Sequence, residues 1–264
     1  MNLELTSKKA FISGSTQGIG FAIAQQLLEE GVEVIINGRQ KDKTENAVLQ
    51  LQQQFPNTKV SGIAADFSNK EEVNNLLEKL NDIDILINNV GIFELKDFET
   101  ISDEDWSHIF EVNVMSSVKL SRQIFPKMVA KNWGRIIFIS SESGVNIPGN
   151  MIHYGMTKAS MAAISNGLSK LTKGTEVTVN TILGGPTYSD GVAGTVEHFA
   201  KLQNISIDQM KATIVQQTNP YSLLQRFIEP KEIANLVTYL SSPLSIATNG
   251  ASLRADGGVL KTLF

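Results

Sequence analysis

The sequence contains no cysteine and only three histidines. The absence of cysteine excludes disulfides, cysteine-based zinc sites and thiol nucleophiles. The histidines His108, His153 and His198 are too scattered along the chain to suggest a histidine-rich metal site, so we expect no bound metal.

Positive charge and long apolar segments are also scarce. The formal net charge is −4, which indicates no basic surface for DNA or RNA. No apolar run approaches the roughly 18 residues that span a bilayer. The N-terminus has no long apolar segment before a cleavage site, as a signal peptide would have. We therefore expect a soluble, cytoplasmic protein that has neither a nucleic-acid nor a membrane partner.

The 264 residues, 42% of them hydrophobic, suit one compact α/β unit that buries its core without disulfide or metal cross-links. Short apolar runs predict strands at 9–13, 32–37, 59–64, 83–87, 135–140, 176–182 and 251–254. Helical periodicity predicts helices at 18–31, 43–55, 70–80, 103–131, 153–173 and 230–240. Ser68 or Asn69, and Ser102, are the expected N-caps of two of these helices.

Strands that alternate with helices and are apolar on both faces predict a parallel sheet covered on both sides. The expected fold class is α/β, a Rossmann-like, doubly wound sheet with seven strands and its ligand at their carboxyl ends. We expect a single domain over residues 1–264. Segment 186–220 interrupts the alternation and allows two interpretations, an ordinary surface helix pair or a mobile substrate lid.

A glycine-rich segment, SGSTQGIG at 13–20, follows the first predicted strand directly and opens the first helix. Glycines allow a tight turn, and the N–H groups at a helix start can bind a pyrophosphate. A glycine turn without a ligand is the alternative, but the position between strand and helix favours phosphate binding. The residues expected to contact a dinucleotide here are Gly14, Ser15, Gln17, Gly18, Ile19 and Gly20.

The second predicted strand ends in Asn37-Gly38-Arg39, where the adenine ribose would lie. A carboxylate at this point binds a ribose 2′-hydroxyl, whereas an arginine favours a 2′-phosphate. Arg39, with no acid beside it, therefore predicts NADP in preference to NAD. The alternative is that Arg39 only solvates a loop.

Two further strand ends carry polar residues. Asp66-Phe67, after the third strand, can hold an adenine edge through the carboxylate and a backbone N–H. Asn88-Asn89-Val90-Gly91 ends the fourth strand, where asparagine side chains can bind backbone groups. Ordinary turn chemistry explains either pair equally well.

Tyr154 and Lys158 are four residues apart in a predicted helix, so their Cβ atoms are expected about 5–6 Å apart. A nearby ammonium favours the phenolate and lowers the tyrosine pKa from about 10. Ser141 follows strand 135–140, where its hydroxyl can donate to a substrate carbonyl oxygen. An isolated YxxxK pattern has an alternative interpretation, a solvated tyrosine–lysine pair on the helix surface without a catalytic role. A Ser-His-Asp hydrolase is poorly supported, because Ser141 lacks a GxSxG elbow and His153 lacks an evident acidic partner.

In this order, the motifs resemble those of the short-chain dehydrogenase/reductase family. The resemblance covers nearly the whole chain, up to ADGG at 255–258. It rests on Gly14, Gly18, Gly20, the NNVG segment 88–91, Trp106, Asn113, Ser141, Tyr154 and Lys158. The chain departs from the family pattern at Val90, where alanine is usual, and at Gly184, where proline is common.

The resemblance implies a role for each matching residue. Tyr154 is the general acid or base, Lys158 lowers its pKa and binds the nicotinamide ribose, and Ser141 positions the substrate oxygen. Asn113 holds a water that links Lys158 to solvent. Without the resemblance, the alternative interpretation of Asn113 is a partly exposed polar residue within a helix. The cofactor contacts implied beyond the glycine loop are Arg39, Asp66, Phe67, Asn89, Gly91, Tyr154, Lys158 and Thr187.

The helix that carries Tyr154 also presents a face of mostly small residues, namely Met156, Ser160, Ala163 and Gly167. This face either packs within its own subunit or, as the resemblance implies, contacts a second copy in a homotetramer. The expected function is an NADP-dependent oxidoreductase that transfers hydride between nicotinamide and a carbonyl or secondary alcohol of unknown identity. The alternatives are a 3-oxoacyl thioester reductase, a sugar or polyol dehydrogenase, and a dinucleotide-binding sensor or scaffold without chemistry.

Overall fold

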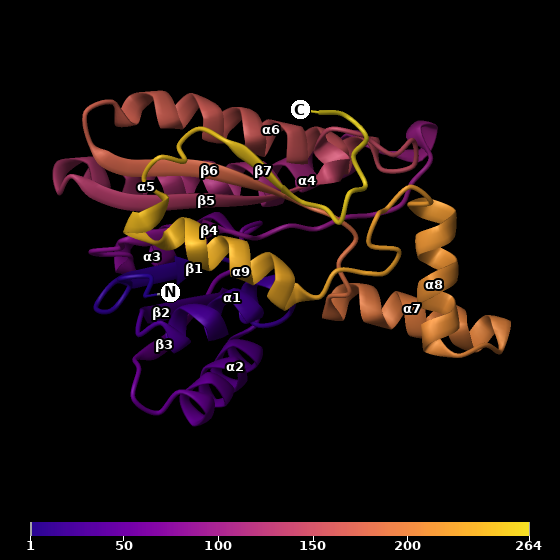
Figure 1. Cartoon of the computed structure of the whole chain (residues 1–264), viewed down its shortest axis with the longest axis horizontal. Coiled ribbons are helices and arrows are strands. Elements are labelled where there is room, and N and C mark those ends of the chain that lie inside the picture. The colour runs from indigo at the N-terminus through magenta and orange to yellow at the C-terminus, as the bar shows by residue number, and fades with distance from the viewer. Residues whose placement is uncertain (1, 264) are drawn as a thin grey trace.

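The computed structural model describes residues 2–263, which form a seven-stranded, all-parallel sheet with helices on both faces (Figure 1). The strand order is β3-β2-β1-β4-β5-β6-β7. The strands are β1 (Lys9–Ile12), β2 (Glu33–Gly38), β3 (Val60–Ala64), β4 (Ile85–Asn88), β5 (Trp133–Ser141), β6 (Glu176–Gly184) and β7 (Ser252–Ala255). The predicted Rossmann-like, doubly wound sheet is confirmed.

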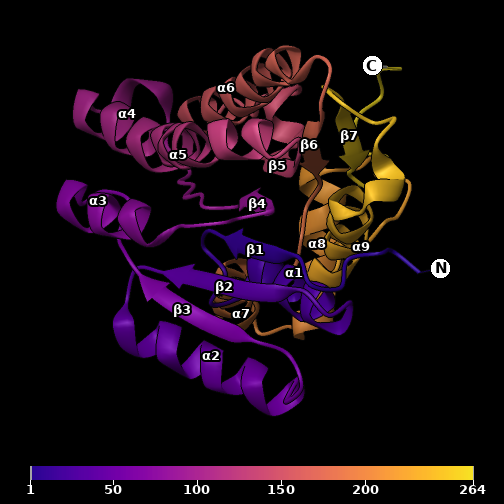
Figure 2. The same ribbon diagram turned by 90° about the vertical axis from the view of Figure 1, so that its left-hand side faces the viewer.

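The helices cover the sheet in two layers (Figure 2). One layer consists of α1 (Gly18–Glu29), α2 (Lys41–Gln54) and α9 (Pro230–Ser241), and the other of α3 (Lys70–Lys79), α5 (Ser116–Ala130) and α6 (Ile152–Ser169). In β1, Ala10 and Ile12 point into the core of the first layer, and Phe11 points into the core of the second. Successive strand residues face opposite sides, which is why strands covered twice are apolar throughout. Within residues 2–263, no helix has the length and hydropathy needed to cross a membrane.

Two helices begin at the predicted capping residues. The Asn69 side chain accepts hydrogen bonds from the N–H groups of Glu71 (3.0 Å) and Glu72 (3.3 Å) at the start of α3. Ser102 and Asp105 form a capping box at the start of α4 (Asp103–Phe110). Both predicted helix starts are confirmed, the first with Asn69 rather than Ser68 as the cap.

The predicted helix 103–131 contains a wider turn in its middle. A π-helical turn, Glu111–Met115, separates α4 from α5. Asn113 lies at the centre of this turn and is fully buried. The apolar pattern continues on both sides, so helical periodicity does not reveal the change, although such turns are frequent at functional sites.

Segment 186–220 contains two helices, α7 (Asp190–Gln203) and α8 (Ile207–Thr218), which project from the body of the molecule (Figure 1). They pack on each other through a small cluster formed by Val196, Ala200 and Met210. This cluster is separate from the two cores that flank the sheet. A helix pair is therefore present in the segment for which the sequence left two interpretations.

Candidate active site

The glycine-rich loop between β1 and α1 is held from two sides by asparagines. Asn37 in β2 accepts a hydrogen bond from Gly14 N–H with its side chain (3.1 Å) and from Ser15 N–H with its carbonyl (2.7 Å). Asn89, directly after β4, donates from its side chain to the Gly14 carbonyl (2.7 Å). Ser15 is fully buried, and its hydroxyl donates to the Ile12 carbonyl (2.7 Å). These bonds fix the path of the loop backbone.

The start of α1 has the features of an anion site. A Cβ atom at Gly20 would lie 2.5 Å from the Gly14 carbonyl oxygen, so only glycine lets the helix approach the loop this closely. Gln17, which is exposed, precedes α1 without a side-chain cap, and no acid lies in the first turn of this described helix. Ile19 in the same turn packs against the apolar core. An uncapped helix start presents backbone N–H groups to a negatively charged ligand.

One of these N–H groups has an anionic partner from a distant part of the chain. Gly18 N–H donates to Asp190 Oδ2 at 2.7 Å, and Asp190 is the first residue of α7. A Cβ atom at Gly18 would lie 3.4 Å from the Cβ of Ser189. The α7–α8 pair therefore contacts the glycine loop, and no local sequence pattern marks this contact.

Arg39 lies exposed just after β2, and its charge acts on Asp66 just after β3. Burial by itself raises the pKa of Asp66. Hydrogen bonds from Ser68 and the charge of Arg39 outweigh this effect, so that the pKa lies below its ordinary value. Phe67 is buried, with its side chain in the core of the α3 layer.

Gly38, the last residue of β2, has no room for a side chain. A Cβ atom there would lie 2.5 Å from Thr16 Cγ2 and 2.9 Å from Thr44 Oγ1. The methyl group of Thr16, from the glycine-rich loop, thus occupies the space in which a side chain at position 38 would begin.

Ser141, Tyr154 and Lys158 meet at the carboxyl end of β5. Ser141 is the last residue of β5 and pairs with Gly184, the last residue of β6. The phenol of Tyr154 in α6 lies close enough to Ser141 for this hydroxyl to lower the pKa of the phenol. Lys158 Nζ lies 5.5 Å from the centroid of the Tyr154 ring and donates to the Ile139 carbonyl at 3.0 Å. The structure thus brings together the three side chains for which we predict chemistry.

The pKa of Tyr154 beside Lys158 differs from the prediction. Burial, which the hydrogen bond with Ser141 offsets only in part, raises the pKa of Tyr154 to about 12, and the charge of Glu142 adds to the increase. Burial lowers the pKa of Lys158 to about 8. Lys158 Nζ contacts the Ile139 carbonyl and the Met161 sulfur (3.8 Å). The predicted lowering of the tyrosine pKa is therefore not found in this structure, because the ammonium is desolvated and directed elsewhere.

Asn113 and Gly91 adjoin Lys158. Asn113 Oδ1 accepts from Ile92 N–H (2.8 Å), and Nδ2 donates to the Ile92 carbonyl (2.9 Å) and to Thr157 Oγ1 (3.0 Å). A Cβ atom at Gly91 would lie 3.2 Å from Lys158 Nζ. The alternative of Asn113 as a partly exposed helix residue is wrong, since it is fully buried and ties the segment after β4 to α6.

Thr187 lies in the turn between β6 and α7. It is buried, and its hydroxyl donates to the Gly185 carbonyl at 2.9 Å. A Cβ atom at Gly185 would lie 2.6 Å from the carbonyl oxygen of Asp256, so this glycine is required by the turn that follows β7.

Glu142 is a charged group at this centre to which the sequence patterns give no role. The Ser141 hydroxyl donates to Glu142 Oε2 at 3.0 Å. Burial raises the pKa of Glu142, hydrogen bonds with Ser143 and Ser141 offset part of this increase, and the nearby charge of Asp256 adds to it. Its place next to Ser141 in the sequence is the one signal that points to it.

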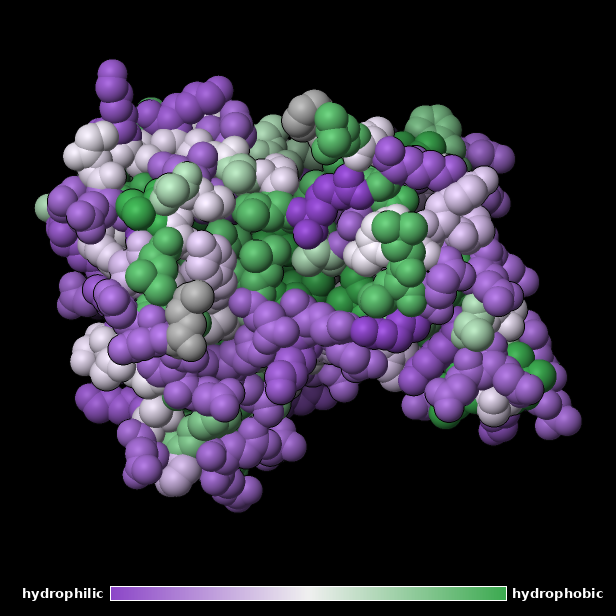
Figure 3. Space-filling view, viewed as in Figure 1, coloured by the Kyte–Doolittle hydropathy of each residue, from purple (hydrophilic) through white to green (hydrophobic). Residues whose placement is uncertain are grey.

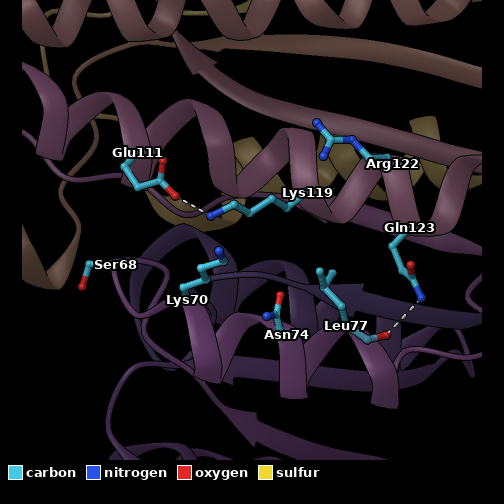
Figure 4. A pocket seen from close by; sticks show the side chains of 8 residues that line it. All are labelled: Ser68, Lys70, Asn74, Leu77, Glu111, Lys119, Arg122 and Gln123. Carbon is cyan, nitrogen blue, oxygen red and sulfur yellow. Dashed lines mark hydrogen bonds and ion pairs between the residues drawn. The ribbon is translucent and has the colours of Figure 1, made fainter.

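A separate pocket of about 280 Å³ lies between α3 and α5 (Figure 4). Lys119 forms an ion pair with Glu111 there, and Gln123 donates to the Leu77 carbonyl at 3.3 Å. Among the described residues, no side chain that we assign to the active site lines this pocket. It is therefore distinct from the centre at the strand ends.

The short chain dehydrogenase family matches residues 8–199. This match spans the glycine loop, Asn113, Ser141, Tyr154 and Lys158, and it agrees with the fold and the arrangement of the site. The chain therefore belongs to the short-chain dehydrogenase family, and it is an oxidoreductase that acts on CH–OH or C=O groups.

Individual relatives resemble the chain over its whole length. It is 42% identical over 264 residues, all of both chains, to the uncharacterized oxidoreductase YvaG of Bacillus subtilis (strain 168). It is 30% identical over 258 residues to D-beta-hydroxybutyrate dehydrogenase of Cupriavidus necator, covering 96% of this chain and 98% of the relative. The crystal structure of L-sorbose reductase from Gluconobacter frateurii complexed with NADPH and L-sorbose is 29% identical, covers 100% of both chains and has a TM-score of 0.93.

Proposed function

We propose that the protein is an NADP-dependent oxidoreductase that transfers hydride between nicotinamide and a carbonyl or secondary alcohol, with Tyr154 as general acid or base. The observation that carries this proposal is the meeting of Ser141 and Tyr154 at the carboxyl edge of the sheet, beside Lys158. Ligands of open α/β sheets bind at this edge, and a dinucleotide whose pyrophosphate lies at α1 reaches along it.

The residues present fit such a cofactor. The close approach at Gly20 brings the start of α1, where Gly18 N–H is bonded to Asp190, next to the glycine loop, and Arg39 offers a positive charge where a 2′-phosphate would lie. The L-sorbose reductase structure contains NADPH, which supports NADP over NAD. When bound, the nicotinamide supplies or accepts the hydride.

In the reducing direction, hydride adds to the carbonyl carbon and Tyr154 donates its phenolic proton to the carbonyl oxygen, giving an alcohol. The pKa of about 12 keeps this phenol protonated at neutral pH, so its proton is present for donation. Ser141 donates to the same oxygen as negative charge develops there. The Lys158 ammonium stabilises the phenolate that remains, and Asn113 holds α6 and the segment after β4 in place.

Segment 186–220 is proposed as the cover of the substrate site. Its helix α7 begins against the glycine loop through Asp190. The chain that follows α8 exposes Tyr221, Leu223 and Leu224. Figure 3 shows apolar side chains gathered near the middle of this face, between the body of the molecule and the α7–α8 pair. Such a surface suits a segment that closes over a substrate.

A second copy of the chain is proposed to pack against α6 in a homotetramer. Ala163 and Gly167 are exposed on α6, and beyond its chain neighbours and the adjoining backbone of α6 no described atom lies within 4 Å of a Cβ atom placed at Gly167. The adjoining groove between α5 and α6 is lined by the largely apolar set Val118, Ser121, Arg122, Phe125, Pro126, Ile164 and Leu168. Small residues beside an apolar groove allow close packing of a partner helix. Light scattering of the purified protein tests the oligomeric state.

The direct test of the proposed chemistry is Tyr154→Phe. The variant should retain NADPH binding, while its turnover on a panel of ketones and ketoses falls by about 10²–10⁴-fold because the proton donor is lost. Tyr239→Phe, which changes a partly exposed tyrosine on α9, is the matched control and should keep full activity. Unchanged turnover in Tyr154→Phe overturns the assignment, and NADPH binding by the wild type without turnover on any carbonyl favours a sensor.

A further inference from the structure

Glu142 places a carboxyl group among the reacting side chains, and the proposed mechanism does not use it. Its Oε2 accepts the Ser141 hydroxyl at 3.0 Å, and its charge acts on the Tyr154 phenol. The charged neighbour that acts on Glu142 is Asp256, another acid. Asp256 is itself buried and holds the turn after β7 by accepting from Gly258 N–H and Leu260 N–H, both at 3.0 Å.

The proposed function forces an exchange of hydrogen bonds at this point. A serine hydroxyl has one proton, and in this structure the proton of Ser141 is directed to Glu142. During carbonyl reduction the same proton must turn to the substrate oxygen. The Glu142 carboxylate then retains the interaction with Ser143 that lowers its pKa but loses the Ser141 hydroxyl, in a half-buried position where an unfilled acceptor is costly. A substrate that brings a replacement donor is therefore favoured.

We propose that Glu142 determines specificity by accepting a hydrogen bond from a hydroxyl on the carbon next to the reacting carbonyl. The inference rests on the proposed function and assigns its substrates to the α-hydroxy ketones, the class that includes ketoses, with vicinal diols and polyols as products. The α-hydroxyl lies on the carbon next to the carbonyl. It therefore reaches the Glu142 oxygen from which the Ser141 hydroxyl has turned away, while Ser141 donates to the carbonyl oxygen.

The same geometry disfavours two other classes of carbonyl compound. A simple ketone offers no donor to Glu142. A 2-oxo acid brings a carboxylate to this position, next to the Glu142 carboxylate, where like charges repel. The balance of the reaction is unchanged: the ketone carbon gains a hydride from NADPH and its oxygen gains the proton of Tyr154.

The test compares three small probes in NADPH oxidation assays: hydroxyacetone, methoxyacetone and pyruvate. Methoxyacetone keeps the carbon skeleton and the neighbouring oxygen of hydroxyacetone but has no hydroxyl to donate. We expect wild-type kcat/KM to be at least about 10-fold to 100-fold higher for hydroxyacetone than for either other probe, since a site built to bind a hydroxyl rejects analogues without one.

Two variants distinguish the role of Glu142 as a hydrogen-bond acceptor from the role of its negative charge. Glu142→Leu removes the acceptor, and the ratio of hydroxyacetone to methoxyacetone should fall to within about threefold of unity. Glu142→Gln keeps an acceptor oxygen but removes the charge, so it should retain most of that ratio while pyruvate reduction rises. Glu78→Gln on α3 is the matched control for loss of one carboxylate and should change none of the ratios.

The outcomes distinguish this inference from the proposed function. If the wild type reduces methoxyacetone and hydroxyacetone with equal kcat/KM, the role of Glu142 is overturned but the reductase proposal stays intact. An unchanged ratio of the two kcat/KM values in a Glu142→Leu variant that still binds NADPH has the same meaning. If Glu142→Leu does not fold, the comparison of probes in the wild type decides the matter. A wild type that is inactive on all three probes overturns the role of Glu142. If it then reduces other carbonyl compounds, the proposed function stands. If it reduces no carbonyl compound, the proposed function is overturned as well.

Discussion

The floor of the site, formed by the strand ends and α6, is built differently from its proposed cover, segment 186–220. In the floor, the side chains of Asn37, Asn89 and Asn113 each bridge separate parts of the fold through at least two hydrogen bonds. In the cover, α7 and α8 pack on a small cluster of their own, and Asp190 contacts the glycine loop. Regions with few buried contacts open at lower cost than densely bonded ones. The proposed proton transfer thus takes place in a rigid part of the molecule, and the proposed cover of the substrate site is loosely attached.

The largest effect is expected in the floor, from Asn113→Ala. The substitution leaves the N–H and carbonyl of Ile92 without their side-chain partner, which should lower the free energy of unfolding by about 2–4 kcal/mol. Activity should fall by more than about 100-fold, because the support of α6 next to Lys158 is lost. Urea unfolding and NADPH oxidation measure the two effects. Asn81→Ala, at an exposed position, should change neither, and a stable, active Asn113→Ala would show that the floor is not held as described.

The second effect is a pH dependence that originates in the floor. Burial lowers the pKa of Lys158 to about 8, so its ammonium is complete below that pH and is lost above it, while Tyr154, with a pKa of about 12, stays protonated. The kcat/KM for reduction should therefore be level near neutral pH and fall about tenfold per pH unit above about pH 8. Lys158→Arg keeps a positive charge to higher pH and should remove the decline, whatever its absolute rate. A wild-type profile that stays level to about pH 10 would contradict the role of the ammonium.

The smallest effect is expected in the cover, from Asp190→Asn. The Asp190 carboxylate occupies the Gly18 N–H that a pyrophosphate oxygen would accept from, and it adds a like charge beside it. Its removal should tighten NADPH binding by about 3-fold to 10-fold at low salt, and less at high salt. Fluorescence titration of NADPH measures this change. Asp208→Asn on α8 removes the same charge from an exposed position and is the control. Weaker binding in Asp190→Asn would show instead that this residue holds the cover over the cofactor.

The sequence predicts the floor better than the cover because the signals for the floor are local. Each strand end is marked by an apolar run followed by polar residues, which places Ser141, and the four-residue spacing of Tyr154 and Lys158 puts them on one face of a helix. The π-helical turn at Asn113 escapes prediction, because the apolar periodicity is unbroken there and only a tertiary bond to Ile92 shows that the side chain turns inward.

The features that the sequence does not predict depend on contacts between distant segments. The bond between Gly18 and Asp190 joins residues 172 positions apart. The raised pKa of Tyr154 depends on burial and on Glu142, whereas spacing alone emphasises the nearby Lys158. Residue spacing thus identifies which groups meet, but not how far each is removed from water.

The crowding at Gly38 bears on how dinucleotide preference can evolve in this chain. An exchange of NADP for NAD calls for an acid at the end of β2, yet the first carbon of any side chain there would lie 2.5 Å from the Thr16 methyl group and 2.9 Å from the Thr44 hydroxyl. A mutation at position 38 alone meets a steric barrier, so the side chains of Thr16 and Thr44 must shift or become smaller before an acid fits. The effect of an acid at position 38 therefore depends on which residues stand at positions 16 and 44.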